Sequence, residues 1–226
     1  KVVFDYVAGS AVDEIAYARS RDTFSRIELN SNVLRDVSVI DTSESILGKK
    51  VDLPICFAPT GYTRLMHHVG EAAVANVAAQ KNLIYALSTM GTTSPAELAK
   101  SVPNSRRWFQ LYIMKNRADT LAVVKQAKEN GFEALVLTVD TPVPGLRYRD
   151  NRNGLTIPPK IRLNTVLAIA RKPRWWLNLF TTGKLEFAAF RGWDKSLSEL
   201  ADLIFDPSTT LEDINWLRSV WDGPIV

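Results

Sequence analysis

The sequence contains little cysteine and has no long apolar run. Its single cysteine, Cys56, excludes a disulfide within the 226 residues and is typical of a reducing compartment. No apolar run approaches the roughly 20 residues that a membrane-spanning helix needs, and no segment resembles a secretory signal. A cytoplasmic protein is therefore expected, and a disulfide-stapled or membrane-spanning one is not.

An initiator methionine is also missing, because the sequence begins Lys1-Val2-Val3. At the other end, Pro224-Ile225-Val226 is typical of the first residues of a buried strand. Hydrophobic residues make up 46% of the sequence, enough for a sizeable core. We expect residues 1–226 to be the N-terminal part of one larger domain.

Positive charge is concentrated in one segment. Residues 155–195 hold eight basic and two acidic side chains, a net charge of +6, whereas the whole sequence carries +4. The remaining residues are therefore slightly acidic. This pattern indicates a basic insertion, at about residues 150–210, in an otherwise ordinary domain.

Strand-like and helix-like segments alternate through the middle of the sequence. Residues 1–26 are expected to be helical with a break at Gly9-Ser10, and residues 27–46 irregular. Ser94-Pro95-Ala96-Glu97 has the pattern of a helix start. Thr210 or Ser208 is expected to cap a late helix. The predicted strands are 53–58, 84–87, 107–112 and 134–137, and the predicted helices are 70–81, one after Ser94, 119–130, 164–170 and 211–220.

Counted from starts near residues 55, 84, 108 and 134, the predicted strands are 29, 24 and 26 residues apart, a period that strand–helix units of a parallel sheet require. Four such units, a long insertion and the start of a fifth strand predict the first half of a (β/α)8 TIM barrel. An open doubly wound sheet is the alternative. No glycine-rich dinucleotide fingerprint follows any strand, which counts against the alternative.

Polar residues follow or end each predicted strand. They are Pro59-Thr60-Gly61, Ser88-Thr89, Gln110 with Tyr112, and Thr138 with Asp140. Residues two apart on a strand point to the same face, so Gln110/Tyr112 and Thr138/Asp140 form coherent polar sets. Hydroxyl, amide and backbone donors around one rim suit a flat heteroaromatic ligand such as a flavin. Solvated strand ends are the simpler interpretation of each set taken alone.

Five motifs in order carry a family resemblance. These motifs are Phe4-Asp5-Tyr6, Ala58-Pro59-Thr60-Gly61, Leu87-Ser88-Thr89, Phe109-Gln110-Leu111-Tyr112 and Leu137-Thr138-Val139-Asp140-Thr141-Pro142. Together they resemble the FMN-dependent 2-hydroxy acid oxidase and dehydrogenase family, which includes L-lactate dehydrogenase, glycolate oxidase and mandelate dehydrogenase. The resemblance extends from Tyr6 to Val226.

The resemblance implies FMN as cofactor, an L-2-hydroxy acid of the lactate type as substrate, and no metal ion. It implies that the backbone of Pro59, Thr60 and Gly61 lies against the flavin. It further implies flavin-binding roles for Ser88, Gln110 and Thr138, and catalytic and substrate-binding roles for Tyr6, Tyr112 and Arg147. An arginine fork can bind the carboxylate through two hydrogen bonds while the cofactor accepts a hydride.

Two features of the sequence depart from the family pattern. Met90 stands where glycolate oxidase-like members carry tryptophan, which affects preference for the substrate side chain. Arg149 lies two residues beyond Arg147 and is an alternative carboxylate ligand.

His67 and His68 precede a helix and are expected to be structural. The family's base histidine follows the fifth strand, so residues 1–226 alone are expected to be inactive, and a non-catalytic half-barrel acting as a folding or interaction module is the alternative function.

The basic insertion includes Arg171-Lys172-Pro173-Arg174-Trp175-Trp176-Leu177-Asn178-Leu179-Phe180. Cations beside aromatic rings can lie on an anionic bilayer, which predicts a peripheral position on the inner face of the membrane. The alternative is that Trp175, Trp176 and Phe180 pack on the barrel. No nucleic-acid-binding motif is present, so no nucleic-acid partner is expected, whereas a homo-oligomer is.

Overall fold

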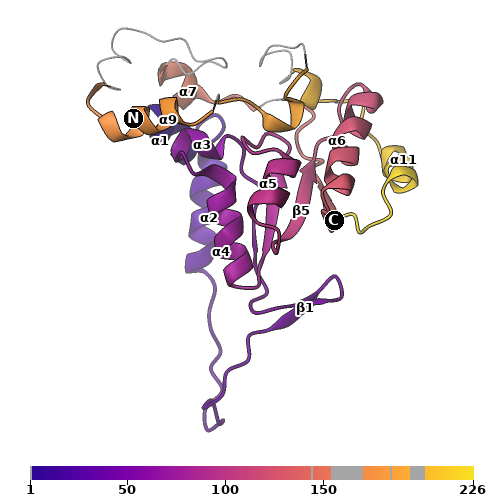
Figure 1. Ribbon diagram of the computed structural model, residues 1–226. Helices are drawn as coiled ribbons and strands as arrows, with labels where there is room; N and C mark the ends of the chain where they lie inside the picture. The colour runs from indigo at the N-terminus through magenta and orange to yellow at the C-terminus, as the bar shows by residue number, and fades with distance from the viewer. Residues whose placement is uncertain (1, 144, 154–169, 184, 194–201) are drawn as a thin grey trace.

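The protein, seen in a computed structural model, contains four parallel strands in one sheet (Figure 1). The structure describes residues 2–143, 145–153, 170–183, 185–193 and 202–226. The strands pair side by side in the order in which they occur along the chain, β3 (Cys56–Phe57), β4 (Ile84–Ser88), β5 (Arg106–Leu111) and β6 (Ala134–Leu137). Their parallel direction brings all four carboxyl ends to the same edge.

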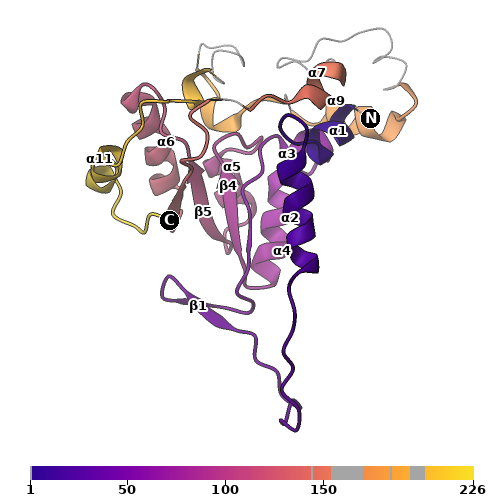
Figure 2. The ribbon, with the colours of Figure 1, turned by 180° about the vertical axis from the view of Figure 1, so that it is seen from behind.

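The helices between the strands pack next to one another on one face of the sheet. They are α4 (Gly70–Gln80), α5 (Pro95–Ser101) and α6 (Arg117–Glu129), and Figures 1 and 2 show them from opposite sides. Buried residues of the three helices form one cluster with Leu87 and Phe109 of the sheet. A doubly wound sheet reverses its strand order and carries helices on both faces. Sequential order with helices on one face is the arrangement of a TIM barrel.

Alternate residues of each strand face opposite sides, as a two-residue period requires. Ile84, Ala86, Trp108 and Ala134 form a separate cluster on the face away from the helices. In a closed barrel this face is the interior. Strands β4 and β6 therefore bury residues on both faces, which explains why they are continuous apolar runs in the sequence.

Capping residues fix the helix boundaries. The Ser94 hydroxyl accepts a hydrogen bond from the Glu97 N–H (3.2 Å), and the Glu97 carboxylate accepts one from the Ser94 N–H (2.8 Å), which confirms the expected start of α5. Helix α6 begins two residues before the predicted Asp119, because the Asn116 side chain accepts from the Ala118 N–H (3.0 Å) and caps it.

The predicted first strand, 53–58, is wrong at its start. Only Cys56–Phe57 pairs with β4, and Leu53 and Ile55 are 39% and 54% exposed. Pro54 interrupts the run because it lacks an N–H donor. The sequence analysis also missed a hairpin of β1 (Glu44–Ile46) and β2 (Lys49–Val51). Its turn has positive φ at both central residues, Leu47 and Gly48, as a two-residue hairpin loop demands.

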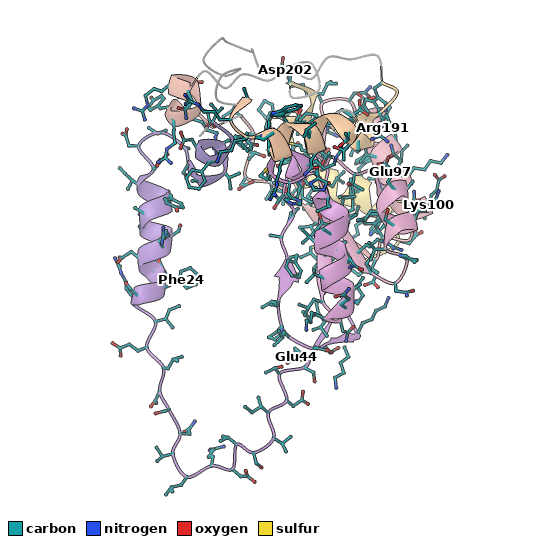
Figure 3. All side chains as sticks on the ribbon, turned by 60° about the vertical axis from the view of Figure 1, so that its left-hand side comes forward. Phe24, Glu44, Glu97, Lys100, Arg191 and Asp202 are labelled. Atoms are coloured by element: carbon teal, nitrogen blue, oxygen red, sulfur yellow. The ribbon has the colours of Figure 1, made fainter. Side chains whose placement is uncertain are left out.

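The N-terminal part forms two helices, α1 (Val2–Ala8) and α2 (Ile15–Ser25), with the expected break between them. Residues 26–43 are irregular, also as expected, and extend away from the sheet as an arm. Figure 3 shows this arm between the labelled residues Phe24 and Glu44. Its apolar side chains are uncovered: Leu29 is 93% exposed and Leu34 is fully exposed.

The segment after β6 contains α7 (Tyr148–Asn153), α9 (Pro173–Thr181), the 3-10 turn η1 (Ala188–Phe190) and α11 (Glu212–Val220). The turn η1 packs on α6, where the Gln126 amide donates to the Ala189 carbonyl (3.0 Å). Beside it, Arg191 forms an ion pair with Glu97 (2.6 Å; Figure 3). Residues 188–191 of the insertion therefore rest on α5 and α6. The predicted helix 164–170 lies outside the described residues except for Ala170.

Helix α11 confirms the prediction of 211–220 to within one residue. The Thr210 hydroxyl accepts a hydrogen bond from the Glu212 N–H (3.3 Å), and the Asp213 carboxylate accepts one from the Thr210 N–H (2.8 Å). Ser208 bonds Asp206 instead. The Thr210 hydroxyl is therefore bonded to the first turn of this helix, whereas the N-cap residue is Leu211, which makes no side-chain cap bond.

Residues 224–226 extend the sheet beyond β6, as predicted. Ile225 bridges Leu135 in parallel. The Leu135 N–H donates to the Pro224 carbonyl (3.0 Å), and the Val226 N–H donates to the Leu135 carbonyl (2.9 Å).

Phe109 tests the helix-side core. It is fully buried and lies edge-on to Phe132, with 5.7 Å between ring centroids. We expect Phe109→Ala to lower the free energy of unfolding by about 3–5 kcal/mol through lost burial and a cavity. Urea denaturation measures the loss. Leu121→Ala on α6, where the side chain is 43% exposed, is the control and should cost less than about 1 kcal/mol.

Asp206 makes stability depend on pH. Its burial alone would raise its pKa, but hydrogen bonds from Ser208 and Arg117 outweigh burial and lower the pKa from 3.8 to about 2. A carboxyl whose folded-state pKa is depressed stabilises the fold above its unfolded pKa and loses that contribution as pH falls through the folded value. Stability should therefore fall between about pH 4 and pH 2, by roughly 1–2 kcal/mol after solvent screening.

Asp206→Asn should flatten this acid limb in urea titrations at several pH values. The matched control is Asp22→Asn, which removes an exposed ion pair with Arg26 and should leave the limb unchanged. An acid limb of equal steepness in Asp206→Asn and the wild type would contradict the assignment.

Candidate functional site

Three of the predicted cofactor residues stand in a row at the carboxyl ends of neighbouring strands. Ser88 and Gln110 are register partners on β4 and β5, and Thr138 directly follows β6. The parity of the strands places all three on the face away from the helices. Pairing of the strands thus brings together residues that are 22 and 28 positions apart in the sequence.

The Gln110 side chain links the row. Its Oε1 accepts hydrogen bonds from the Ser88 hydroxyl and the Thr89 N–H, both at 3.1 Å. Its Nε2 donates to the Thr138 hydroxyl oxygen at 2.8 Å. A glutamine amide that is 3% exposed is thereby held in one orientation, and the hydroxyl proton of Thr138 can still be donated to a ligand.

The loop after β3 approaches the same edge. The Tyr62 N–H donates to the Met90 carbonyl at 3.0 Å, which ties residues 59–62 to the end of β4. A Cβ added to Gly61 would lie 3.1 Å from the Met90 Cβ, so glycine allows a close approach there. Pro59 is half-buried and Thr60 is exposed. The expected segment 59–61 therefore flanks the Ser88–Gln110–Thr138 row.

Tyr6 and Arg147 meet although they lie 141 residues apart. The Arg147 guanidinium carbon lies 5.1 Å from the centroid of the Tyr6 ring, and Arg147 also donates to the Tyr6 carbonyl and pairs with Asp150. Arg149 instead pairs with Glu14. Of the two arginines in this loop, only Arg147 is joined to the predicted substrate tyrosine.

Three tyrosines share this end of the molecule. Burial raises the pKa of the Tyr6 phenol, an effect that Arg147 partly offsets and Asp150 reinforces. Burial also raises the pKa of Tyr112, with Asp140 and Tyr6 contributing. Burial, with Tyr6 adding to it, raises the pKa of Tyr62 to about 12. All three phenols are therefore protonated near neutral pH and can donate hydrogen bonds.

Tyr112 and Thr138 both line a cavity of about 390 Å³. Its other walls come from residues 137–142 and from the segment 204–214 that precedes and begins α11. Tyr112 also meets Phe205 edge-on, at 6.1 Å between ring centroids. The cavity beside Tyr112 and Thr138 is thus bounded partly by the insertion.

Sequence reasoning missed Asp150, Tyr62 and the backbone of Thr89. Asp150 is 7% exposed and holds Arg147 from one helical turn away, on α7. The three-residue spacing from Arg147 to Asp150 is a signal that could have found it. Tyr62 and Thr89 gave no such signal, because their importance comes from the chain segments packed against them.

His67 and His68 lie elsewhere. They follow α3 (Thr63–Met66) and stack on each other with 4.5 Å between ring centroids. They line a separate cavity of about 280 Å³ that none of the predicted cofactor or substrate residues lines. The described residues contain no cluster of three or more potential metal ligands.

The family of FMN-dependent dehydrogenases matches the whole chain, residues 1–226. The chain belongs to the FMN-dependent dehydrogenase family. A protein of Mycobacterium tuberculosis (strain ATCC 25618 / H37Rv), provisionally named an L-lactate dehydrogenase, is 42% identical over 226 residues, which are 100% of this chain and 55% of that protein. Human 2-hydroxyacid oxidase 1 is 36% identical over 228 residues, which cover 100% of this chain and 58% of the human protein.

Solved structures agree on the fold. The crystal structure of the monotopic membrane protein (S)-mandelate dehydrogenase superposes with a TM-score of 0.93 at 32% identity. That alignment covers 99% of this chain and 61% of the mandelate dehydrogenase. The chain thus spans a little over half the length of these relatives. The predicted half TIM barrel is confirmed, and the doubly wound alternative is wrong.

The cofactor of this family is FMN, as predicted. The residues present fit a flavin: the Gln110 amide is held by three hydrogen bonds with the Thr138 hydroxyl at its outer end. Gly61 lets the loop after β3 pack closely against Met90, beside the end of β4. Among the described helices, none is both long and apolar enough to cross a membrane.

The Gln110 link can be tested without substrate. We expect Gln110→Leu to lower the free energy of unfolding by about 1–3 kcal/mol, because the buried Thr89 N–H and Ser88 hydroxyl lose their acceptor. Urea denaturation measures this. Gln80→Leu, on the exposed side of α4, should change stability by less than about 0.5 kcal/mol; equal effects would contradict the central position of Gln110.

Proposed function

We propose that the protein of which these residues form a part oxidises an L-2-hydroxy acid of the lactate type to the 2-keto acid. The observation that carries the proposal is the convergence of Tyr6, Tyr112 and Arg147 beside the hydrogen-bonded row of Ser88, Gln110 and Thr138. The names of the relatives, an L-lactate dehydrogenase, a 2-hydroxyacid oxidase and a mandelate dehydrogenase, support the same substrate class.

The residues divide the work of binding. Ser88, Gln110, Thr138 and the backbone of residues 59–61 would hold the flavin, which would supply the acceptor for the hydride equivalent. Arg147 binds the substrate carboxylate through its guanidinium fork. The neutral phenols of Tyr6 and Tyr112 donate hydrogen bonds, Tyr6 to the carboxylate and Tyr112 to the oxygen that becomes the keto group. Together they fix the orientation of the α-carbon.

Arg147 can do this while keeping its present partners. Its guanidinium bonds Asp150 and the Tyr6 carbonyl, but arginine carries five N–H donors, so a carboxylate can bind alongside. Asp150, buried at one side of the guanidinium, keeps the fork aimed toward Tyr6. The oxidation also needs a base for the hydroxyl proton, and His67 and His68 face another cavity. We therefore propose that residues 1–226 alone do not turn over.

The wider setting follows from the same residues. We place 1–226 in the N-terminal part of a single TIM-barrel domain with its basic insertion at about 150–210.

Helix α9, with exposed Arg171, Lys172 and Arg174 at its start, supports a peripheral position at the inner face of a membrane, and one solved neighbour is a monotopic membrane protein. Trp175 and Trp176 are half-buried, so part of each ring packs on the protein. A homo-oligomer remains our expectation.

A non-catalytic interaction module is the second candidate. The arm of residues 26–43 favours it, because Leu29, Leu34 and Val39 are 93%, 103% and 86% exposed. Uncovered apolar surface of this kind marks a contact with another chain or chain segment. Absence of flavin bleaching by every 2-hydroxy acid tested on the full-length protein would support this candidate over the enzyme.

Anaerobic mixing of the full-length, flavin-loaded protein with L-lactate should bleach the flavin absorbance, and D-lactate should not. Arg147→Lys should lower kcat/KM by about 10- to 100-fold, because lysine cannot bind a carboxylate through a planar fork. The matched variant Arg149→Lys should change it by less than about threefold. The opposite ranking would assign the carboxylate to Arg149.

A further inference from the structure

Glu71 is a buried acidic residue that the proposed reaction does not use. It lies in the first turn of α4 and is 0% exposed. A carboxylate inside a protein is unfavourable unless hydrogen-bond donors replace the water that it loses. The partners of Glu71 therefore indicate which part of the molecule depends on it.

Those partners lie in the loop after β4, residues 89–93, which we call the β4 loop. The Thr92 N–H donates to the Glu71 Oε1 at 2.6 Å, and the Thr92 hydroxyl lies 2.8 Å from each carboxylate oxygen. The Thr93 hydroxyl donates to Oε2 at 2.8 Å. Hydrogen bonds to a charged acceptor are stronger than neutral ones. Glu71 thus fastens the β4 loop to the start of α4.

The β4 loop is also bonded to the loop after β3. The Arg64 N–H donates to the Thr92 hydroxyl oxygen at 3.2 Å, and the Tyr62 N–H donates to the Met90 carbonyl at 3.0 Å. Figures 1 and 2 both show α3, which follows Tyr62, at one end of α4. Residues 59–62 therefore lie where the β4 loop places them.

On its other side the β4 loop is bonded to the polar row at the strand ends. The Met90 N–H donates to the Ser88 hydroxyl oxygen at 3.1 Å, and the Gly91 N–H donates to the Ser88 carbonyl at 2.9 Å. The Ser88 hydroxyl in turn donates to Gln110, which also accepts from the Thr89 N–H. A shift of the β4 loop would therefore disturb both the loop after β3 and the row.

We propose that Glu71 is a positioning residue for the flavin. It acts through Thr92 and Thr93, which hold the β4 loop at a fixed distance from the loop after β3. This spacing determines whether the backbone of residues 59–61 and the Ser88 hydroxyl reach the same planar ligand. The proposal rests on the flavin site proposed above, and it deepens that site by naming the group that fixes its two sides.

Two substitutions of Glu71 separate its hydrogen bonds from its bulk. Methionine has nearly the length of glutamate but is only a weak acceptor, whereas glutamine keeps an amide oxygen for the Thr92 N–H and an NH2 group that a threonine hydroxyl can accept from. The change in FMN fluorescence on titration with the flavin-free full-length protein measures the Kd. We expect Glu71→Met to weaken FMN binding about tenfold and Glu71→Gln by less than about threefold.

Ser105→Ala is the control for a loss of stability alone. The Ser105 hydroxyl is buried and donates to the Val102 carbonyl at 2.8 Å, just before β5 begins and at the edge of the sheet opposite the candidate site. This variant should unfold at a lower urea concentration but leave the FMN affinity and the visible circular dichroism of the bound flavin unchanged. Glu71→Met should change both. Equal loss of FMN affinity in the two variants, or no loss in Glu71→Met, would overturn the proposal.

Thr93 provides a milder pair that decides the matter if Glu71→Met does not fold. Thr93→Val removes one hydrogen bond to Glu71, and Thr93→Ser retains the hydroxyl that makes it. Only the valine variant should weaken FMN binding, by about threefold. Equal FMN affinities of the two variants would contradict the role of Glu71.

These outcomes are distinct from failure of the proposed reaction, because FMN affinity is measured without substrate. A wild-type protein that binds FMN but is not bleached by L-lactate would contradict the reaction. The ranking of the variants by FMN affinity would still decide the role of Glu71.

Discussion

The buried side chain of Gln110 joins three strands at the edge where the candidate site lies. One amide oxygen accepts from β4 and one amide nitrogen donates to the residue after β6, so neither strand end can shift without breaking a buried hydrogen bond. Leaving a buried donor without an acceptor lowers the free energy of unfolding by more than one intramolecular hydrogen bond typically contributes. This constraint keeps the ends of the strands level and gives a planar ligand a fixed edge to bind.

The constraint works because the strands are buried on both faces. Leu87, Phe109 and Leu135 face the helices, while Ile84, Trp108 and Ala134 fill the inner face. A slip of one residue would exchange these two sets and move Ser88, Gln110 and Thr138 to the helix side. The apolar core and the polar row at its end are therefore fixed by the same register.

Function is divided between the sheet and segments far from it in sequence. The row at the strand ends is suited to a flavin, whereas Tyr6 on α1 and Arg147 before α7 are suited to a carboxylate. The insertion borders two cavities. Residues 204–214 bound the cavity beside Tyr112, and α9 bounds the cavity that His67 and His68 line. One insertion thus lies next to the site of chemistry and next to the surface proposed to meet a membrane.

The sequence alone determined the elements whose signals are local. The Ser94–Glu97 capping box, the period of strand and helix, and the apolar runs of β4, β5 and β6 all depend on residues within a few positions of one another. The ordered motifs also identified the family, and with it FMN. Alternation along the strands was sufficient to predict that Gln110 and Tyr112 share a face.

Only the tertiary structure decided what depends on distant contacts. The β1–β2 hairpin was not predicted, and β3 was predicted too long. An apolar run does not by itself show that Pro54 interrupts the pairing or that Val51 packs into the inner core. The contact of Arg147 with Tyr6 and the pairing of Arg149 with Glu14 needed the packing of α1 on α7, since both arginines have the same chemistry. The cavity of about 280 Å³ beside His67 and His68 was invisible in sequence for the same reason: Arg64 and Arg174, which both line it, lie 110 positions apart, and only folding brings them together.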